Sequence, residues 1–367
     1  MPTPSLTPTP CLDARSSVFV PHLGEFERIA RYLRPLAAAC PGALELSDDA
    51  ALLSVTAGHE LVVTTDAMVA GIHFLADDPP DDIAAKLLRT NLSDLAAMGA
   101  APLAYSLVLA LPQELGDDWL AAFTTSLAAD QERFGIVLVG GDSVATRGPI
   151  TLAITALGQV PRGSALTRRV RGLADGQLVF VTGTIGDAAL GLKIVLGELA
   201  SDTPGADLLV SRLRRPWPRL ELGMALRNLA TAAIDVSDGL VADLGHICKI
   251  SRCAACIESA HLPLSEPTRA LIAARPELLA TVLNGGDDYE LVFTAPPDRV
   301  QAIADLAARL ETTVTEIGRL ERGSAGEVRV VDETGKPLTP LGRGWDHFAI
   351  KPENASRPAA TSVISVI

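Results

Sequence analysis

The 367-residue chain has few cysteines, and they are unevenly spaced. The five at positions 11, 40, 248, 253 and 256 are too few for a disulfide framework. Cys253-x-x-Cys256 has no second cysteine pair and no histidine pair at zinc-finger spacing, which argues against zinc. We expect the three cysteines between 248 and 256 to be small buried residues on a helix and on the strand after it.

Basic residues are also scarce, since 31 Lys and Arg face 44 Asp and Glu for a net charge of −13. This balance argues against nucleic acid as a partner, because a phosphate backbone needs a basic face. The longest uncharged stretch, 95–113, is interrupted by Gly99, Pro102 and Pro112, so no membrane span is predicted. Residues 1–21 lack a signal-peptide pattern and are predicted to be a disordered extension. The expectation is a cytoplasmic enzyme.

Alternating strand and helix patterns predict an α/β protein with two domains, at about 22–160 and 161–350, and a flexible tail at 351–367. The first domain should begin with a helix whose apolar face includes Phe26 and Leu33. Its other predicted elements are strands at 61–65, 105–111, 136–139 and 150–158 and helices at 83–98 and 119–134. The second should contain strands at 178–182, 255–258, 289–294 and 328–331 and helices at 188–199, 221–229, 239–251, 270–273 and 297–310.

Three apolar runs end in an aspartate: Asp66, Asp142 and Asp235. A strand that stops at a carboxylate is predicted to place it at a sheet edge, where α/β proteins keep their ligands. Two unit charges about 4 Å apart cost roughly 4 kcal/mol at an effective dielectric of 20. Divalent cations relieve this repulsion, and hard oxygen ligands suit magnesium. The pattern therefore predicts several Mg²⁺ ions and phosphate chemistry.

The segment Asn91-Leu92-Ser93-Asp94 places a polar side chain in the apolar stripe of its helix. Asn91 lies four residues from both Leu87 and Leu95, so it needs a hydrogen-bond partner or a function. Asp94 follows about one turn later. An internal capping network explains the segment as well as a functional site does, and the sequence leaves both open.

Other acidic and glycine-rich segments each allow a structural and a functional interpretation. Asp48-Asp49 suits a solvated turn, and Gly140-Gly141 suits an ordinary turn or close backbone approach to a ligand. Ser237-Asp238, before a helix, suits an N-cap or a phosphate site. The chain contains no Walker-type phosphate loop and no protein-kinase signature.

Taken in order along the chain, these segments resemble the thiamine-monophosphate kinases, a family within the aminoimidazole ribonucleotide synthetase-like ATP enzymes. The resemblance runs from Gly24 to Phe348. The matching segments are Asn91–Ala100, Val139–Asp142, Val181–Thr184, Ile234–Leu240, Gly285–Glu290 and Trp345–Phe348. The last two are the more family-specific ones.

The resemblance implies transfer of the ATP γ-phosphoryl group to thiamine monophosphate, with several Mg²⁺ ions. It also implies a homodimer whose interface is formed by the N-terminal domain. The implied metal ligands are Asp49, Thr65, Asp66, Asp94, Asp142 and Asp235, with the Thr64 backbone and Asp238 as further candidates. The implied ATP contacts are Gly141, Asp142, Arg168 and Ser237, and the implied thiamine monophosphate contacts are His73, Asp287 and Trp345. Asp94, Asp142 and Arg168 are the implied catalytic residues.

The chemistry of the residues agrees with this activity, because an anionic phosphate acceptor needs no general base. Trp345 suits a cation–π contact with a thiazolium ring, although a surface aromatic explains it too. The chain departs from the family pattern at Ser47, which replaces a glycine, and at Asp287, which replaces a glutamate. The loop 143–147 is two residues longer than usual. Selenophosphate synthetase, aminoimidazole ribonucleotide synthetase and an inactive magnesium- or nucleotide-binding dimer are the alternatives, but Cys11 lacks the glycine-rich loop of the first.

Overall fold

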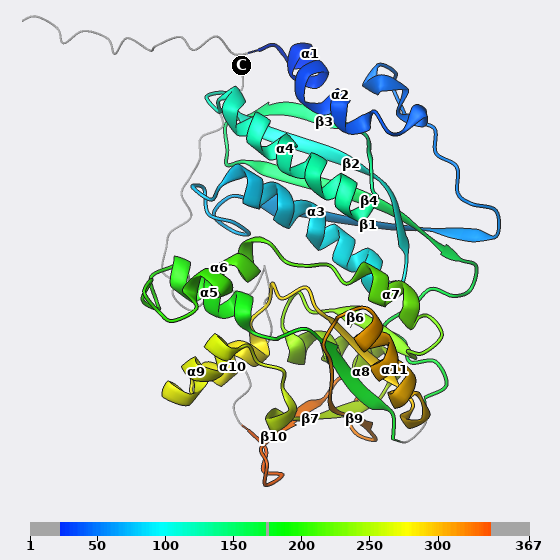
Figure 1. Cartoon of the computed structure of the whole chain (residues 1–367), viewed down its shortest axis with the longest axis vertical. Coiled ribbons are helices and arrows are strands. Elements are labelled where there is room, and N and C mark those ends of the chain that lie inside the picture. The colour runs from blue at the N-terminus through cyan, green and yellow to red at the C-terminus, as the bar shows by residue number, and fades with distance from the viewer. Residues whose placement is uncertain (1–22, 174–175, 339–367) are drawn as a thin grey trace, which may run out of the picture.

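The computed structural model describes residues 23–173 and 176–338 and divides them into two halves, each built on one sheet (Figure 1). The first sheet has the order β1-β4-β2-β3. Its strands are β1 (His59–Val69), β2 (Ala101–Pro112), β3 (Leu138–Thr146) and β4 (Thr151–Pro161). The β1–β4 and β4–β2 pairs are antiparallel and β2–β3 is parallel.

Two long helices, α3 (Pro80–Ala97) and α4 (Asp117–Phe134), pack with the first half's sheet in one core. α3 begins with a proline and carries Asp81 and Asp82 in its first turn, which suits the helix dipole. Every residue from Ile83 to Ala97 except Asp94 is buried, so α3 is enclosed on all sides and not along one apolar stripe alone. α4 ends at Gly135, whose left-handed φ of 65° terminates it.

The N-terminal segment is helical from residue 25 to 37, as the sequence predicts, but its middle part is π-helical. It contains α1 (Glu25–Arg28), a π-helical stretch (Ile29–Leu33), α2 (Arg34–Ala37) and a 3₁₀ stretch (Pro41–Leu46). The prediction of an apolar face is wrong at Phe26, which is 83% exposed. Leu33 packs against the core as expected.

The second half is a six-stranded sheet of order β10-β7-β9-β5-β8-β6. Its strands are β5 (Leu178–Thr182), β6 (Ala232–Asp235), β7 (Ala254–Glu258), β8 (Leu291–Ala295), β9 (Val314–Glu321) and β10 (Val328–Val331). Its helices are α5 (Asp187–Val195), α6 (Ala206–Arg214), α7 (Leu220–Leu226), α8 (Leu240–Ser251), α9 (Glu266–Ala274), α10 (Leu278–Asn284) and α11 (Val300–Arg309). Only the β10–β7 pair is parallel.

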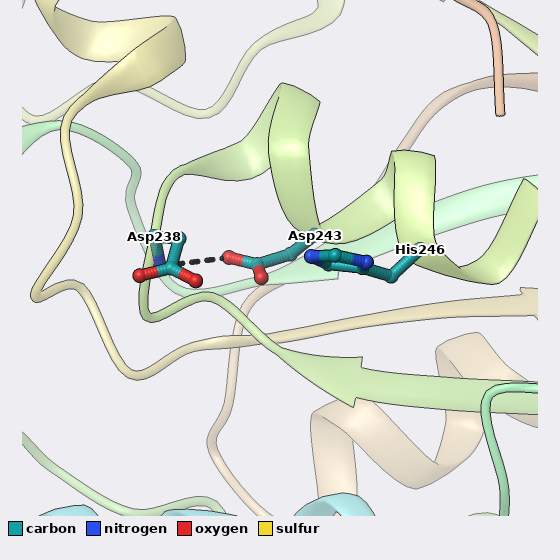
Figure 2. A group of neighbouring side chains, drawn as sticks. All are labelled: Asp238, Asp243 and His246. Atoms are coloured by element: carbon teal, nitrogen blue, oxygen red, sulfur yellow. Dashed lines mark hydrogen bonds between the residues drawn. The ribbon is translucent and has the colours of Figure 1, made fainter. Parts of the chain in front are cut away.

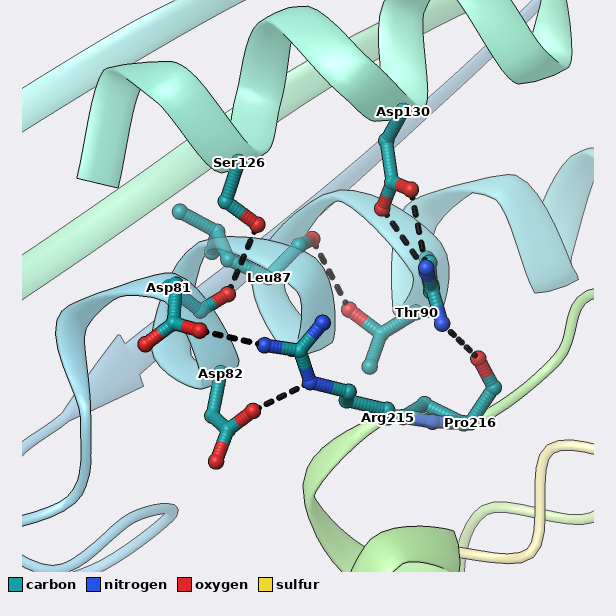
Figure 3. A network of polar contacts seen from close by, with 9 residues as sticks. Asp81, Asp82, Leu87, Thr90, Ser126, Asp130, Arg215 and Pro216 are labelled. Atoms are coloured by element: carbon teal, nitrogen blue, oxygen red, sulfur yellow. Dashed lines mark hydrogen bonds and ion pairs between the residues drawn. The ribbon is translucent and has the colours of Figure 1, made fainter. Parts of the chain in front are cut away.

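Helix α3 joins the two halves, because it contacts β1, β2 and β4 on one side and α6, α7, β6 and β8 on the other. One apolar core runs continuously from α3 to Leu226 and Phe293 of the second half. Ion pairs add to this contact: Arg215, just after α6, pairs with Asp81 and Asp82 at the start of α3 (Figure 3). Residues carried by α3 therefore lie at the junction of the halves.

Several expectations about the elements need correction. β1 and β3 do not end at Asp66 and Asp142 but continue through them, and residues 143–146 of the expected loop belong to β3. The expected helix 188–199 ends at Val195. Helices α6 and α10 and strand β9 have no counterpart among the elements predicted from the sequence. No helix within the described part of the chain is both long and apolar enough to cross a bilayer.

Candidate active site

Three aspartates from three elements form a carboxylate cluster at the junction of the halves. Asp66 lies within β1, Asp94 near the end of α3 and Asp235 at the end of β6. Asp235 is buried, with 4% exposure, and the other two are partly buried. The cluster exists because α3 packs on β1 with one side and on β6 with the other.

Hydroxyl and amide side chains hold the cluster in place. The Thr64 Oγ1 hydroxyl donates to Asp94 Oδ2 at 2.5 Å, and the Ser93 Oγ hydroxyl donates to Asp235 Oδ2 at 2.9 Å. Asn91 donates from Nδ2 to the Leu87 carbonyl at 2.9 Å. Its Oδ1 accepts the Asp66 amide hydrogen at 3.2 Å. Asn91 thus belongs to an internal hydrogen-bond network that also positions a member of the cluster.

The cluster is short of positive charge. Burial, together with the charge of Asp94, raises the pKa of Asp66 to about 6. Burial also raises the pKa of Asp94, although the Thr64 hydroxyl and the Arg168 charge oppose the rise. Asp235 has a pKa well above its usual range because it is buried and faces Asp94. Carboxylates kept this close favour a bound cation.

The turn after β6 is organised by Asp243, on the first turns of α8. Its Oδ2 accepts the amide hydrogens of Ser237, Asp238 and Gly239 at 3.0, 3.0 and 3.1 Å. Asp238, Asp243 and His246 each offer a metal-ligating atom, and these atoms lie within 4.8 Å of one another (Figure 2). Three donors already occupy Asp243 Oδ2, so this group serves first to fix the turn that carries Ser237.

A second polar group, at the same junction, surrounds Asp287. Lys86 of α3 donates to Asp287 Oδ2 at 3.0 Å and to the His73 carbonyl at 3.1 Å. The Tyr289 hydroxyl donates to Asp287 Oδ1 at 3.2 Å. The structure therefore brings together two of the residues implied for thiamine monophosphate. The third, Trp345, lies outside the described residues.

Asp49, Gly141 and Asp142 line a separate hollow of about 190 Å³, with apolar walls that include Leu33 and Leu46. Across the sheet, the strand pairing aligns Asp66 of β1 with Gly141 of β3. Asp142, the next residue of β3, is aligned with Val108 of β2 instead. Successive residues of a strand face opposite sides, so Asp142 points away from the carboxylate cluster within one chain. Gly141 allows the close β2–β3 approach, since a Cβ there would lie 1.8 Å from the Leu107 carbonyl oxygen.

The remaining implied residues are placed as follows. Thr65 is exposed on the face opposite Asp66, where its Oγ1 lies 2.9 Å from that of Thr155. Arg168 is exposed, but it lies close enough to Asp94 for its positive charge to oppose the rise in the pKa of Asp94. Lys86 and Asp243 were not singled out from the sequence. Lys86 carried no clear signal, because its neighbours three and four residues away on the helix are Asp82, Ile83, Arg89 and Thr90, which form a mostly polar face.

The fold and the carboxylate cluster define an AIR synthase related protein. Residues 47–160 match the AIR synthase related protein N-terminal domain, and residues 174–331 match its C-terminal domain. The crystal structure of the hydrogenase maturation protein HypE in complex with ATP shares the fold, with 20% identity and a TM-score of 0.70.

The chain belongs, within that class, to the thiamine-monophosphate kinase family. It is 43% identical to the Caulobacter vibrioides thiamine-monophosphate kinase over 326 residues, covering 88% of this chain and 90% of the relative. The Stenotrophomonas maltophilia thiamine-monophosphate kinase crystal structure matches with 43% identity and a TM-score of 0.72, covering 80% of this chain and 91% of that one. AaThiL complexed with AMPPCP and TMP matches with 30% identity and a TM-score of 0.70, covering 90% of this chain and 100% of that one.

Proposed function

We propose that this chain is a kinase that transfers the γ-phosphoryl group of ATP to thiamine monophosphate, giving thiamine diphosphate and ADP. The observation that carries the proposal is the carboxylate cluster of Asp66, Asp94 and Asp235 in a chain 43% identical to named thiamine-monophosphate kinases. A matching structure, AaThiL, holds AMPPCP and TMP together, which supports ATP and thiamine monophosphate as the substrate pair.

Magnesium fits the residues that are present. The cluster supplies buried carboxylate oxygens, the ligands that Mg²⁺ prefers, and its raised pKa values reflect negative charge that burial leaves uncompensated. Bound Mg²⁺ would neutralise the ATP phosphates. The proposed ligands are Asp49, the Thr64 backbone, Thr65, Asp66, Asp94, Asp142, Asp235 and Asp238; of these, Asp49, Thr65 and Asp142 lie apart from the cluster within one chain. Among them, Thr64 already donates its hydroxyl to Asp94, so its side chain positions a ligand.

The proposed reaction is a direct, in-line phosphoryl transfer. The acceptor is a phosphate oxygen that is already anionic at neutral pH, so no side chain has to remove a proton. The protein's task is to align the two substrates and to neutralise charge. Arg168 supplies positive charge beside Asp94, as its effect on the Asp94 pKa indicates.

The two substrates would occupy different groups of residues. Gly141, Asp142, Arg168 and Ser237 are proposed to contact ATP, and His73, Asp287 and Trp345 to contact thiamine monophosphate. The structure supports the acceptor side by joining His73 and Asp287 through Lys86. ATP as co-substrate favours a cytoplasmic location.

We further propose that the enzyme is a homodimer formed through the first half's sheet. On the face of that sheet opposite α3 and α4, Leu61, Val63, Val108 and Val144 are 47%, 56%, 40% and 46% exposed among the described residues. Such a row of exposed apolar side chains is typical of an interface. Asp142 lies on this face, so a second copy would also cover the hollow that contains Asp49.

The proposal is tested by incubating the purified chain with ATP, Mg²⁺ and thiamine monophosphate and separating the products by chromatography. Thiamine diphosphate should form only when all three are present. Free thiamine and thiamine diphosphate serve as alternative acceptors. Product from thiamine at a comparable rate, or none from thiamine monophosphate with protein that binds ATP, would overturn the assignment.

A further inference from the structure

Lys86 is a buried cation at the junction of the two halves. Its side chain is 5% exposed, and a buried ammonium group is tolerated only when it is paired and hydrogen-bonded. Lys86 meets this requirement with partners from two places. It pairs with the Asp287 carboxylate of the second half at 3.0 Å and donates to the His73 carbonyl of the first half at 3.1 Å.

Asp287 is held at both of its carboxylate oxygens, while its side chain remains 32% exposed. Tyr289 donates its hydroxyl to Oδ1 at 3.2 Å, while Lys86 takes Oδ2. Burial raises the pKa of Tyr289 well above its usual range, so the phenol stays protonated and can donate. The Asp287 amide donates to the Ser237 carbonyl at 3.0 Å. Both of the carboxylate's oxygens therefore have a fixed position.

The backbone around Asp287 is strained, so the contacts around it must hold Asp287 in this conformation. Asp287 and Tyr289 have left-handed φ values of 69° and 49°, a conformation that costs free energy for residues with side chains. Gly286 packs so closely that a Cβ would lie 1.9 Å from the Ser237 carbonyl oxygen. Strain of this kind persists where surrounding contacts over-determine a functional geometry.

His73 is fixed from the other side. It follows β1 in a turn where its Nδ1 accepts the Val69 amide hydrogen at 3.1 Å. Its carbonyl oxygen accepts from Lys86. One ammonium group thus sets the separation between His73 and Asp287, which come from segments more than two hundred residues apart.

We propose that Lys86 is a positioning residue that determines affinity for the phosphate acceptor. This inference rests on the proposed function, because it takes His73 and Asp287 as contacts of thiamine monophosphate. Among the described contacts, Lys86 forms no hydrogen bond to a side chain that is proposed to contact ATP. The link to that group is the backbone hydrogen bond from the Asp287 amide to the Ser237 carbonyl, which a change of the Lys86 side chain does not remove. Its loss should therefore act on the acceptor and leave the nucleotide site in place.

The test compares Lys86→Met with wild type in steady-state kinetics. Methionine keeps most of the apolar part of the lysine side chain but lacks the ammonium group, so it cannot pair with Asp287. We expect the KM for thiamine monophosphate to rise on the order of 10-fold, while the KM for ATP changes less than about 2-fold. Lys193→Met is the matched control, because Lys193 forms a more exposed ion pair with Glu198 far from this group.

Tyr289→Phe gives a second test that removes only a hydroxyl group and preserves packing. We expect a rise of about 3-fold in the KM for thiamine monophosphate, again without a matching change for ATP. This variant decides the question if Lys86→Met does not fold. Equal changes in both KM values, or a change in melting temperature alone, would overturn the inference. Failure of wild type to phosphorylate thiamine monophosphate would instead refute the proposed function itself.

Discussion

Single residues in the carboxylate cluster work against the stability of the fold. Asp66, Asp94 and Asp235 all have raised pKa values, because burial and mutual repulsion penalise their charged forms. Proteins retain such groups where a ligand compensates them, so the cost marks the site.

Asp94→Asn removes one charge but keeps an oxygen that can accept from Thr64. We expect kcat/KM to fall by about 100-fold or more, since a metal ligand contributes several kcal/mol to phosphoryl transfer. The melting temperature should stay the same or rise, because repulsion is reduced. Asp305→Asn, an exposed helical position, is the control. Near wild-type turnover in folded Asp94→Asn protein would contradict the role of the cluster.

The pH dependence of stability follows from the same shifts. The folded-state pKa of Asp66 is about 6, against a usual value of 3.8, and that of Asp243 is about 7. Between about pH 4 and 7 the native state therefore binds more protons than the unfolded state, so stability falls as pH rises. Metal-free protein should melt a few degrees higher at pH 5 than at pH 7.5. Added Mg²⁺ should stabilise it more at pH 7.5 than at pH 5, and the opposite order in thermal melts would refute the account.

At the scale of elements, the sequence predicted the helix α3 but not its role in joining the two halves. The apolar repeat from Ile83 onward predicted the helix almost to its ends. Short apolar runs likewise predicted the strands β5 and β10. Local pattern did not show that Asp66 and Asp142 lie inside strands, because glycine and aspartate discourage that assignment while sheet pairing overrides it. Strand β9 alternates imperfectly, with adjacent buried residues Ile317 and Gly318, and was missed. The predicted domain boundary near residue 161 remains a prediction.

In the candidate site, too, the sequence predicted some features and not others: it predicted several of the residues but not the contacts that hold them. Ordered motifs named Asp94, Asp235 and Asp287, since each lies in a recognisable segment. The contacts that fix them did not follow from sequence, because Lys86 and Asp287 are separated by 201 residues and Ser93 and Asp235 by 142. Only the packing of α3 against the second half brings them together.

Arg89 tests how strongly α3 is tied to its neighbours. It is buried and forms two hydrogen bonds to Asp130 of α4, at 2.7 and 2.8 Å, with Phe134 and Trp217 beside its guanidinium. Arg89→Met should lower the free energy of unfolding by about 3–5 kcal/mol, because Asp130 is left buried and unpaired. Denaturant unfolding measures this. Arg275→Met, which breaks an exposed pair with Glu277, should change the free energy of unfolding very little. An equally small effect of Arg89→Met would contradict a stabilising role for the Arg89–Asp130 pair.

At the scale of the whole molecule, the proposed dimer interface is the face of the first sheet that exposes Leu61, Val63, Val108 and Val144. Val63→Glu places a charge at a side chain that is 56% exposed in one chain and buried in the proposed dimer. We expect wild type to have twice the chain mass by light scattering and Val63→Glu to shift toward the monomer and lose activity. Leu196→Glu, at a similarly exposed position of the second half, should leave the mass unchanged. A monomeric, active wild type would refute the dimer.

The central claim is that phosphate passes from ATP to thiamine monophosphate on this chain, and isotope transfer tests it most directly. Purified protein is incubated with Mg²⁺, thiamine monophosphate and ATP labelled at the γ-phosphorus, and label is followed into thiamine diphosphate and inorganic phosphate. The account predicts that nearly all transferred label appears in thiamine diphosphate. Label that appears only as inorganic phosphate would show an ATPase and would contradict the account.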